Sequence, residues 1–218
     1  PGAGNYLVFV NIPLNSTVQR AAPSLTVRLN GEEVENGWAE QAYIRSTGGH
    51  NEASLHWSGV INGSGSLTVD TQWRAQTGEV VIDTDKEASI YIEKLGNSGI
   101  LDTASYDILL DYNSAEGSLI TWDSPDESLD SSTYGHAALS PEVRVTQAGS
   151  YLLVYNDQLE GGNARANPVV TIQVNGNAVP GLTTKSHYIR QTGGHIGASG
   201  TIVGLLDGLK ANDIITVH

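Results

Sequence analysis

An internal repeat is the feature that most restricts how this chain can fold. Residues 3–54 align without gaps on residues 148–199, at a constant offset of 145 residues, and 22 of the 52 aligned positions are identical. A period of 145 residues matches a whole domain and is too long for one turn of a solenoid. We therefore divide the chain into a first module, a middle segment and a second copy of the module, at residues 1–73, 74–145 and 146–218.

Short runs of β-branched and aromatic residues predict β-strands in both modules and in the middle segment. In one of these runs, Leu25, Val27 and Leu29 share one face of the predicted strand. The dipeptide Asn-Gly at 30–31 and 175–176 is typical of a type I′ hairpin turn, because both central residues of that turn need positive φ. No stretch of 12 residues shows helical periodicity, so the sequence predicts an all-β protein of the sandwich type.

Charge and composition exclude several classes of function. The chain carries 24 acidic and 11 basic side chains, for a formal net charge of −13, so its average field repels nucleic acids and acidic membranes but attracts cations. It has no cysteine, which excludes disulfides and zinc–thiolate sites, and no apolar run long enough for membrane insertion. Methionine is also absent, as expected of a processed chain or of a piece of a longer one. Because loss of a signal peptide fits secretion, we predict an extracellular or cell-surface protein, although an internal fragment would look the same.

The order of the predicted strands resembles that of C1q/TNF-like jelly-roll domains. The residues that carry this resemblance are Ala148–Leu152, Val170–Gly176 and Leu209–Val217, with an opening stretch at Trp122–Val145 and a final strand at Ala88–Glu93. The Tyr-Ile-Arg…Gly-His segment is also similar to bacterial C1q-like proteins of unassigned role. The resemblance implies tandem jelly-roll β-sandwiches built from an internal repeat of about 145 residues. It also implies trimers that bind proteins or glycans, in some members with calcium. The family's turn motif has glycine where this chain has Asn212.

Each predicted jelly roll lacks strands at one end. The first, residues 1–112, has no counterpart of the opening stretch, and the second, residues 113–218, has no counterpart of the closing strands around Glu79–Asp83 and Ala88–Ile92. A sandwich that ends within a sheet leaves unpaired backbone groups and an open core, both of which cost free energy. Either the chain is an excerpt from a longer repeat array, or a neighbouring molecule donates the missing strands. Our hypothesis is the second, in which identical subunits join head to tail into an extracellular filament.

An arginine and a histidine recur at the same spacing in both modules. Arg45 and His50 have the counterparts Arg190 and His195. On the functional interpretation, each pair binds a carboxylate or a sugar, with arginine as a planar fork and histidine as a switchable donor. On the structural interpretation, Thr-Gly-Gly-His is a turn whose glycines accept positive φ and whose histidine bonds to the backbone. Repetition favours the structural interpretation, because a requirement of the fold recurs wherever the fold does.

An acidic segment is the candidate cation site. Asp123, Asp126, Glu127 and Asp130 supply clustered carboxylates of the kind that calcium prefers. The segment does not match an EF-hand loop, and a solvated acidic loop is the alternative interpretation. Calcium is therefore the one cofactor that the sequence suggests.

Two tryptophans are candidate contacts for a glycan. Trp38 and Trp57 can stack on sugar rings or pack in the core or an interface. Their counterparts in the second module are Thr183 and Ile202, so the fold itself does not require tryptophan at these positions.

The sequence contains no zinc motif, nucleophile elbow or phosphate-binding loop, and we predict that the protein is not an enzyme. We predict an extracellular structural or adhesive subunit of a fibre, a homo-oligomer or polymer assembled head to tail by strand complementation. The alternative is a trimeric, calcium-assisted adhesin that binds a glycan or a surface protein. A glycan-active enzyme is the third hypothesis, since paired carboxylates across a cleft cannot be recognised in a sequence.

Overall fold

All of the secondary structure described in the computed structural model is β. The structure describes residues 2–16, 21–40, 44, 52–74, 80–82, 86–96, 102–104, 117–125, 132–160, 166–184, 189 and 197–218. These residues form sixteen strands in several antiparallel sheets, and none of them is helical. The prediction of an all-β fold is therefore confirmed.

The chain divides into two compact units, and each unit combines segments that are distant in sequence. The first comprises residues 1–94, 155–167 and 186–201, and the second comprises residues 95–154, 168–185 and 202–218. The domain boundary predicted between residues 112 and 113 lies outside the described residues.

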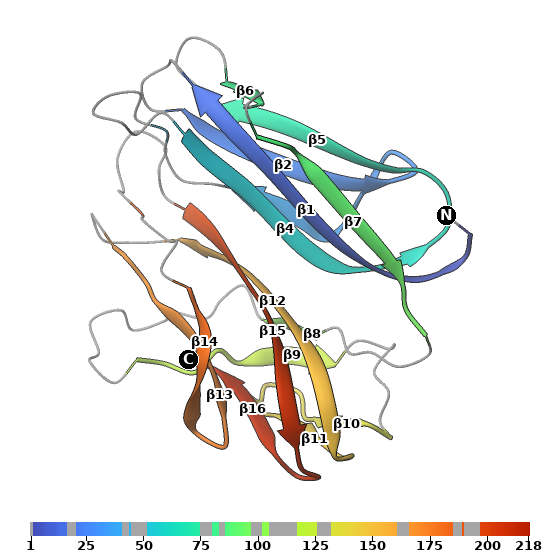
Figure 1. Ribbon diagram of the computed structural model, residues 1–218, viewed down its shortest axis with the longest axis vertical. Helices are drawn as coiled ribbons and strands as arrows, with labels where there is room; N and C mark the ends of the chain where they lie inside the picture. The colour runs from blue at the N-terminus through green and yellow to red at the C-terminus, as the bar shows by residue number, and fades with distance from the viewer. Residues whose placement is uncertain are drawn as a thin grey trace. The chain divides into compact units, whose positions relative to one another are not determined.

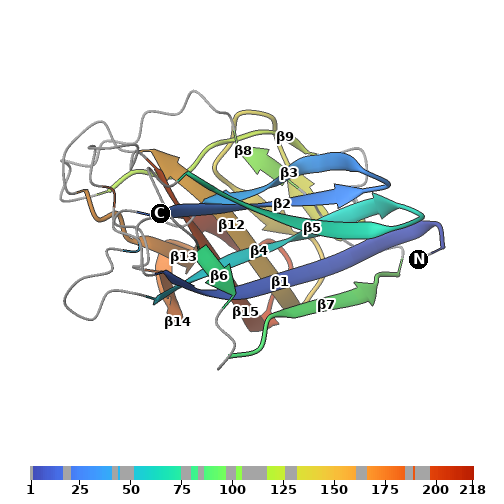
Figure 2. The ribbon, with the colours of Figure 1, turned by 90° about the horizontal axis from the view of Figure 1, so that it is seen from above.

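The first unit contains two antiparallel sheets (Figure 1). In one sheet, β1 (Gly4–Ser16) lies between β4 (Glu52–Gly63) and two shorter strands, β6 (Val80–Ile82) and β7 (Ser89–Lys94). In the other, β2 (Ala22–Leu29) lies between β3 (Glu32–Glu40) and β5 (Leu67–Arg74). Seen from above, β7 runs along the edge of β1 that faces away from β4 (Figure 2).

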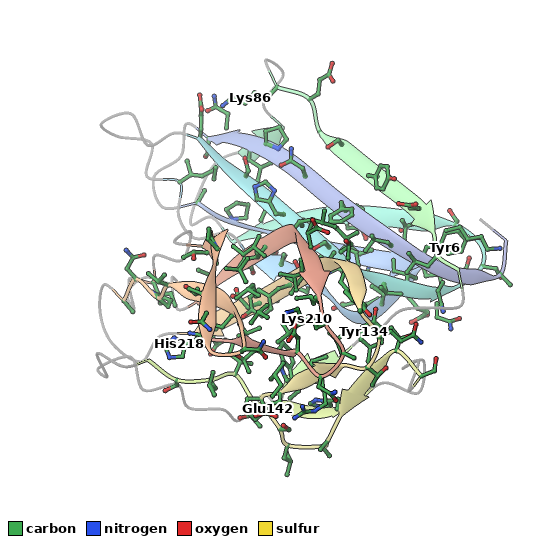
Figure 3. All side chains as sticks on the ribbon, turned by 60° about the horizontal axis from the view of Figure 1, so that its bottom comes forward. Tyr6, Lys86, Tyr134, Glu142, Lys210 and His218 are labelled. Atoms are coloured by element: carbon green, nitrogen blue, oxygen red, sulfur yellow. The ribbon has the colours of Figure 1, made fainter. Side chains whose placement is uncertain are left out.

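The second unit contains a larger antiparallel sheet. Its order is β10 (Tyr134–His136), β11 (Val143–Val145), β16 (Ile214–Val217), β13 (Val170–Val174) and β14 (Asn177–Thr184). Tyr134 and Glu142, the latter one residue before β11, mark the β10–β11 edge of this sheet in Figure 3. A separate pair consists of β8 (Asp102–Ala104) and β9 (Trp122–Pro125). Another pair, β12 (Gly149–Glu160) and β15 (Gly197–Leu209), runs through segments of both units.

The hydrophobic core of the first unit contains residues from both of its sheets. Every second residue of β1 from Tyr6 to Leu14 belongs to it, as strand alternation requires. On β2, Leu25 and Val27 are completely buried, and Leu29 packs against the same core. This confirms the predicted shared face of that strand.

The two Asn-Gly hairpin turns have the backbone conformation that the sequence predicts. Asn30 and Asn175 have φ of 54° and 51°, and the glycines that follow have φ of 89° and 76°. Positive φ at both central positions is the requirement of a type I′ turn. Asn212 has φ of 76°, so it also occupies the left-handed region, which glycine and asparagine adopt more readily than other residues.

Backbone contacts recur at the 145-residue offset. The isolated antiparallel bridge between Ala21 and Ile44 has a counterpart between Ala166 and Ile189. The pairing of β1 with β4 has a counterpart in β12 with β15, and the pairing of β2 with β3 has one in β13 with β14. The pairing of β2 with β5 has a counterpart in β13 with β16, where Ile215 takes the place of Leu67, three residues beyond that offset.

A side-chain contact recurs in the same way. The Tyr6 hydroxyl donates a 2.6 Å hydrogen bond to the Gly2 carbonyl, and the Tyr151 hydroxyl donates a 2.6 Å hydrogen bond to the Gln147 carbonyl. The two modules thus share local contacts as well as residues.

Candidate functional site

Most of the residues singled out in the sequence lie outside the part of the chain that the structure describes. These residues are Arg45, His50, Arg190, His195, Asp126, Glu127 and Asp130. Asp123 lies on β9. Among the described residues, no group of three or more His, Cys, Asp or Glu side chains is placed to hold a metal ion. The calcium, carboxylate and sugar contacts of these residues therefore stay predictions.

The two candidate tryptophans lie on different strands of the first unit. Trp57 on β4 is 5% exposed and belongs to the hydrophobic core, so its ring serves as a packing group. Trp38 on β3 is half-buried and lies opposite Thr26 of β2. Core packing, one of the two interpretations of the sequence, therefore accounts for Trp57, whereas Trp38 keeps a partly exposed surface.

The structural feature that points to a function is one edge of β12. Its counterpart β1 has partners on both edges, because β4 pairs along nearly its whole length and β7 pairs with Tyr6–Asn11. β12 pairs with β15, and within the described part of the chain no strand lies along its other edge. A strand edge of this kind presents backbone N–H and C=O groups that can bind another extended segment.

Two side-chain contacts establish the direction of the β12–β15 pair. Ser150 donates a hydrogen bond to Asp207, and Thr201 donates one of 2.8 Å to Asn156. Because the residue number rises along β12 while it falls along β15, the two strands are antiparallel. Leu152 of β12 therefore lies opposite Leu205 of β15, two residues inward from the Ser150–Asp207 contact.

We call the edge of β12 that has no partner among the described residues its open edge, and the sequence of this edge carries no chemical protection against association. Its segment Gly149–Val154 contains no charged residue and no proline. Natural edge strands usually carry charges, prolines or bulges that prevent pairing with another chain. Two other edge strands of this protein follow that rule, since β3 contains four glutamates and β14 contains Pro180.

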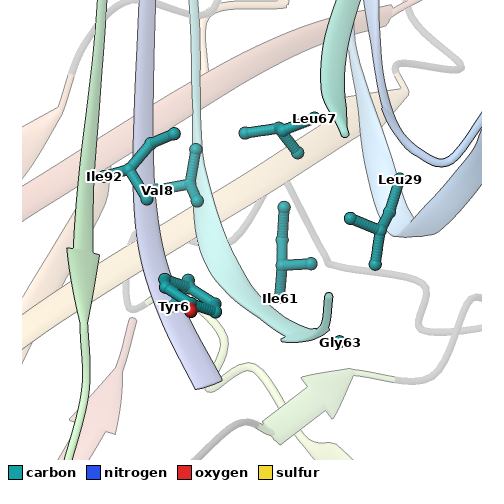
Figure 4. A pocket seen from close by; sticks show the side chains of 7 residues that line it. All are labelled: Tyr6, Val8, Leu29, Ile61, Gly63, Leu67 and Ile92. Carbon is teal, nitrogen blue, oxygen red and sulfur yellow. The ribbon is translucent and has the colours of Figure 1, made fainter. Parts of the chain in front are cut away.

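In the first unit, β7 covers one end of the core. Ile92 of β7 lies opposite Val8 of β1. Figure 4 shows the small apolar pocket that both residues line, together with Tyr6, Leu29, Ile61, Gly63 and Leu67. Tyr6 and Val8 are only 9% and 1% exposed.

Among its described residues, the second unit has a counterpart for every lining residue of this pocket except Ile92. These counterparts are Tyr151, Leu153, Val174, Leu206, Gly208 and Ile215. Tyr151 and Leu153 are half-buried, whereas Tyr6 and Val8 are buried. The end of the second core beside β12 is therefore more accessible than the matching end of the first.

β7 is itself an edge strand with an exposed apolar surface. All six of its residues are exposed, and Ile90, Tyr91 and Ile92 are 52%, 55% and 44% exposed. The Tyr91 hydroxyl donates a 3.0 Å hydrogen bond to Glu93, which raises the pKa of Tyr91 above its usual value. At the end of the strand, the Lys94 ammonium lies 5.9 Å from the centre of the Tyr6 ring.

Two other groups have perturbed protonation equilibria. Asp213 accepts a 2.8 Å hydrogen bond from the Lys210 backbone and another of 2.8 Å from Asn175, and these bonds hold the pKa of Asp213 below its usual value. Partial desolvation lowers the pKa of His56 on β4, whose side chain stays exposed to water in part, because loss of water disfavours the charged imidazolium.

Sequence reasoning found the strands of this site but did not identify the site itself. The signal that could have located it is the uncharged run Gly149–Val154, which aligns with Gly4–Phe9. Within that segment of the first module, Tyr6–Phe9 pairs with β7. The sequence analysis instead gave weight to charged and aromatic side chains. Strand addition depends on backbone groups, which every residue carries.

The chain matches no protein-family model, and no curated protein matches its sequence. Among the residues that the structure describes, there is no helix of the length and apolar character needed to cross a membrane. The β12 edge, which has no partner strand among the described residues, and the half-buried Tyr151 and Leu153 beside it are the features on which a functional proposal can be based.

Proposed function

We propose that the protein is an extracellular structural and adhesive subunit that assembles head to tail by adding strands at open sheet edges. The observation that carries this proposal is the difference between β1, which has strands along both edges, and β12, which has a described partner along one edge only. An open edge binds an extended segment through main-chain hydrogen bonds, in the manner of β-augmentation. Donor and acceptor surfaces that differ within one subunit generate a filament when the rotation between subunits does not close a ring.

The repeat and the strand order support a jelly-roll architecture for each module. In the first module, the recurring pairings join β1 with β4 in one sheet and β2 with β3 and β5 in the other. The middle segment adds β6 and β7 beside β1, and β11 beside β16. This is the division of opening and closing strands that the resemblance to C1q/TNF-like domains implies. We retain tandem jelly rolls, an extracellular location and a calcium-responsive acidic segment as parts of the proposal.

Negative-stain electron microscopy combined with sedimentation velocity tests the assembly. We expect linear particles whose sedimentation coefficient rises with protein concentration, because each added subunit leaves a new acceptor edge. A chain that stays monomeric at every concentration would contradict the proposal.

A second candidate function has a separate observation in its favour. Leu152, Val203 and Leu205 are 56%, 45% and 63% exposed and lie on the two paired strands β12 and β15. An exposed apolar patch of this kind is typical of a protein interface. Compact trimers of fixed size in the same sedimentation experiment would favour the trimeric binding module over the filament.

A further inference from the structure

We propose that the open edge of β12, Gly149–Val154, binds β7 (Ser89–Lys94) of a second copy, while that β7 keeps its pairing with β1 in its own copy. This inference rests on the proposed head-to-tail assembly and names the two strands that join consecutive subunits. We call Gly149–Val154 the acceptor edge and β7 the donor strand.

The backbone of both strands is available for this contact. Within the described residues, β7 pairs with β1 and with no other strand, so its second edge faces away from the sheet. The acceptor edge likewise has no described partner. Pairing the two edges joins two sheets into one and forms new backbone hydrogen bonds without breaking any that exist in either copy.

Apolar side chains on the two strands complement each other. Ile90 and Ile92 lie opposite core residues of β1, yet about half of each side chain is exposed. Tyr151 and Leu153 occupy the matching core-facing positions of β12 and are half-buried. The donor strand can lie beside the acceptor edge so that the core-facing side chains of both strands are on the same side of the joined sheet. Ile90 and Ile92 then cover part of the exposed surface of Tyr151 and Leu153, and are themselves partly covered by them.

A shared strand is favoured over a transferred one. If β7 left its own β1 to pair with β12, it would uncover Tyr6 and Val8 while it covered Tyr151 and Leu153. Such an exchange replaces one set of contacts with an equivalent set and gains little. A donor strand that stays on β1 adds contacts with no loss, so it provides the stronger driving force for assembly.

Charge distribution selects the donor strand among the edges of the molecule. The acceptor edge is uncharged, and the segment Ala88–Ile92 at the start of the donor strand is uncharged as well. The alternative edge β3 would bring four glutamates to a chain whose net charge is already −13. Like charges brought together across a joined sheet oppose pairing, so we expect β3 to be excluded.

The first test compares two exposed leucines that face the same side of adjacent strands. Leu152 lies on the acceptor edge and Leu205 lies on β15, and they are 56% and 63% exposed, so replacing either one leaves the fold intact. We expect Leu152→Asp to weaken self-association about tenfold or more, because aspartate is a poor strand former and repels Glu93 of the donor copy. Leu205→Asp is the matched control and should change the association constant less than about twofold. Sedimentation velocity measures both, and thermal melts check that both variants fold.

The second test uses the absence of native cysteine to form a selective crosslink. Leu152→Cys and Tyr91→Cys are made in separate proteins, mixed and oxidised. Both positions are exposed, near the centres of the two strands and on the same face of the joined sheet. Paired strands bring cysteines within the 4.4–6.8 Å Cα separation that a disulfide needs, so we expect a heterodimer band on a non-reducing gel. Thr68→Cys on the exposed side of β5 replaces Tyr91→Cys in the control and should give no band above background.

The outcomes separate this inference from the proposed function. If Leu152→Asp and Leu205→Asp abolish polymers equally, the subunits associate through their apolar faces and the proposed strand pairing is wrong. Head-to-tail assembly would still hold in that case. Polymers without a Leu152→Cys/Tyr91→Cys crosslink would exclude β7 as the donor strand. A wild-type chain that never associates would contradict the proposed function itself.

Discussion

β1 and β12 are equivalent strands that the protein places in different surroundings. Both begin with Ala-Gly-x-Tyr-Leu, and in both the tyrosine hydroxyl donates a 2.6 Å hydrogen bond to a carbonyl four residues earlier. Yet Leu7 is 5% exposed, whereas Leu152, its counterpart, is 56% exposed. Local sequence therefore determines the contacts within a strand and its turn. Burial depends on which other segments of polypeptide come to lie beside that strand.

The largest expected effect comes from truncating the two equivalent leucines. Leu7→Ala should lower the free energy of unfolding by about 2–4 kcal/mol, because it removes a buried side chain and leaves a cavity. Leu152→Ala should lower it by about 1 kcal/mol or less, since most of that side chain already contacts water. Urea denaturation at a protein concentration too low for assembly measures both values.

This pair also tests the comparison between the strands. Equal losses for the two alanine variants would mean that β1 and β12 have the same burial in solution, and the contrast between them would be wrong. If Leu152→Ala becomes more damaging at concentrations at which the chain assembles, the acceptor edge gains burial from a neighbouring copy, which sharpens the contrast.

Structural features that depend on a few neighbouring residues could be predicted from the sequence. Alternation in Leu25–Leu29 predicted a buried strand face, and the two Asn-Gly dipeptides predicted turns with positive φ at both central residues. The β12 edge was different, because Leu7 and Leu152 are the same residue in the same local pattern. What differs beside these strands is non-local: β7, which follows β1 by more than seventy residues, is paired with β1, whereas no described strand pairs with the matching edge of β12. Propensity and periodicity have no access to that non-local pairing.

The turn asparagines give the second comparison, with an intermediate effect. Asn30 donates a 2.8 Å hydrogen bond to the Ser64 carbonyl, whereas Asn175 donates a 2.8 Å hydrogen bond to the Asp213 carboxylate. Replacing either by alanine removes side-chain hydrogen bonds and puts a Cβ-bearing, non-Asn residue at positive φ, so each variant should lose about 1–3 kcal/mol. Chemical denaturation measures the loss, and Asn→Gly at each site is the control that keeps the backbone conformation.

The two turns should differ in their response to acid. The pKa of Asp213 is lowered in the folded protein, so its contribution to stability is present above its unfolded pKa and is lost as the pH falls through the folded pKa. Asn175→Ala should therefore cost less at pH 3 than at pH 7, while the cost of Asn30→Ala should change little, because a backbone carbonyl does not titrate in this range. A pH-independent cost for both would remove the distinction between the two turns.

The smallest expected effect is a difference between the two modules in how their stability depends on pH near neutrality. His56 of β4 lies opposite Asn11 of β1, and its counterpart in β15 is Thr201, which donates a hydrogen bond to Asn156 instead. Partial desolvation lowers the pKa of His56 in the folded state, although its side chain is exposed in part, so the unfolded state binds the proton more tightly. The free energy of unfolding of the first unit should then fall as the pH drops below about 6.5, and it should level off below the folded pKa. The second module has threonine at this position and lacks this particular dependence.

Exchanging the residue of one module for that of the other isolates this contribution. His56→Thr gives the first module the residue of the second, and it should flatten the pH dependence of unfolding between pH 8 and pH 5.5. The difference between wild type and variant is the relevant quantity, because both proteins contain the same other five histidines and any contribution of these cancels. If wild type instead gains stability as the pH falls, His56 is better accommodated as the charged form, and the sign of its pKa shift is wrong. If the free energy of unfolding of His56→Thr depends on pH as steeply as that of wild type, His56 does not contribute to the difference between the two modules.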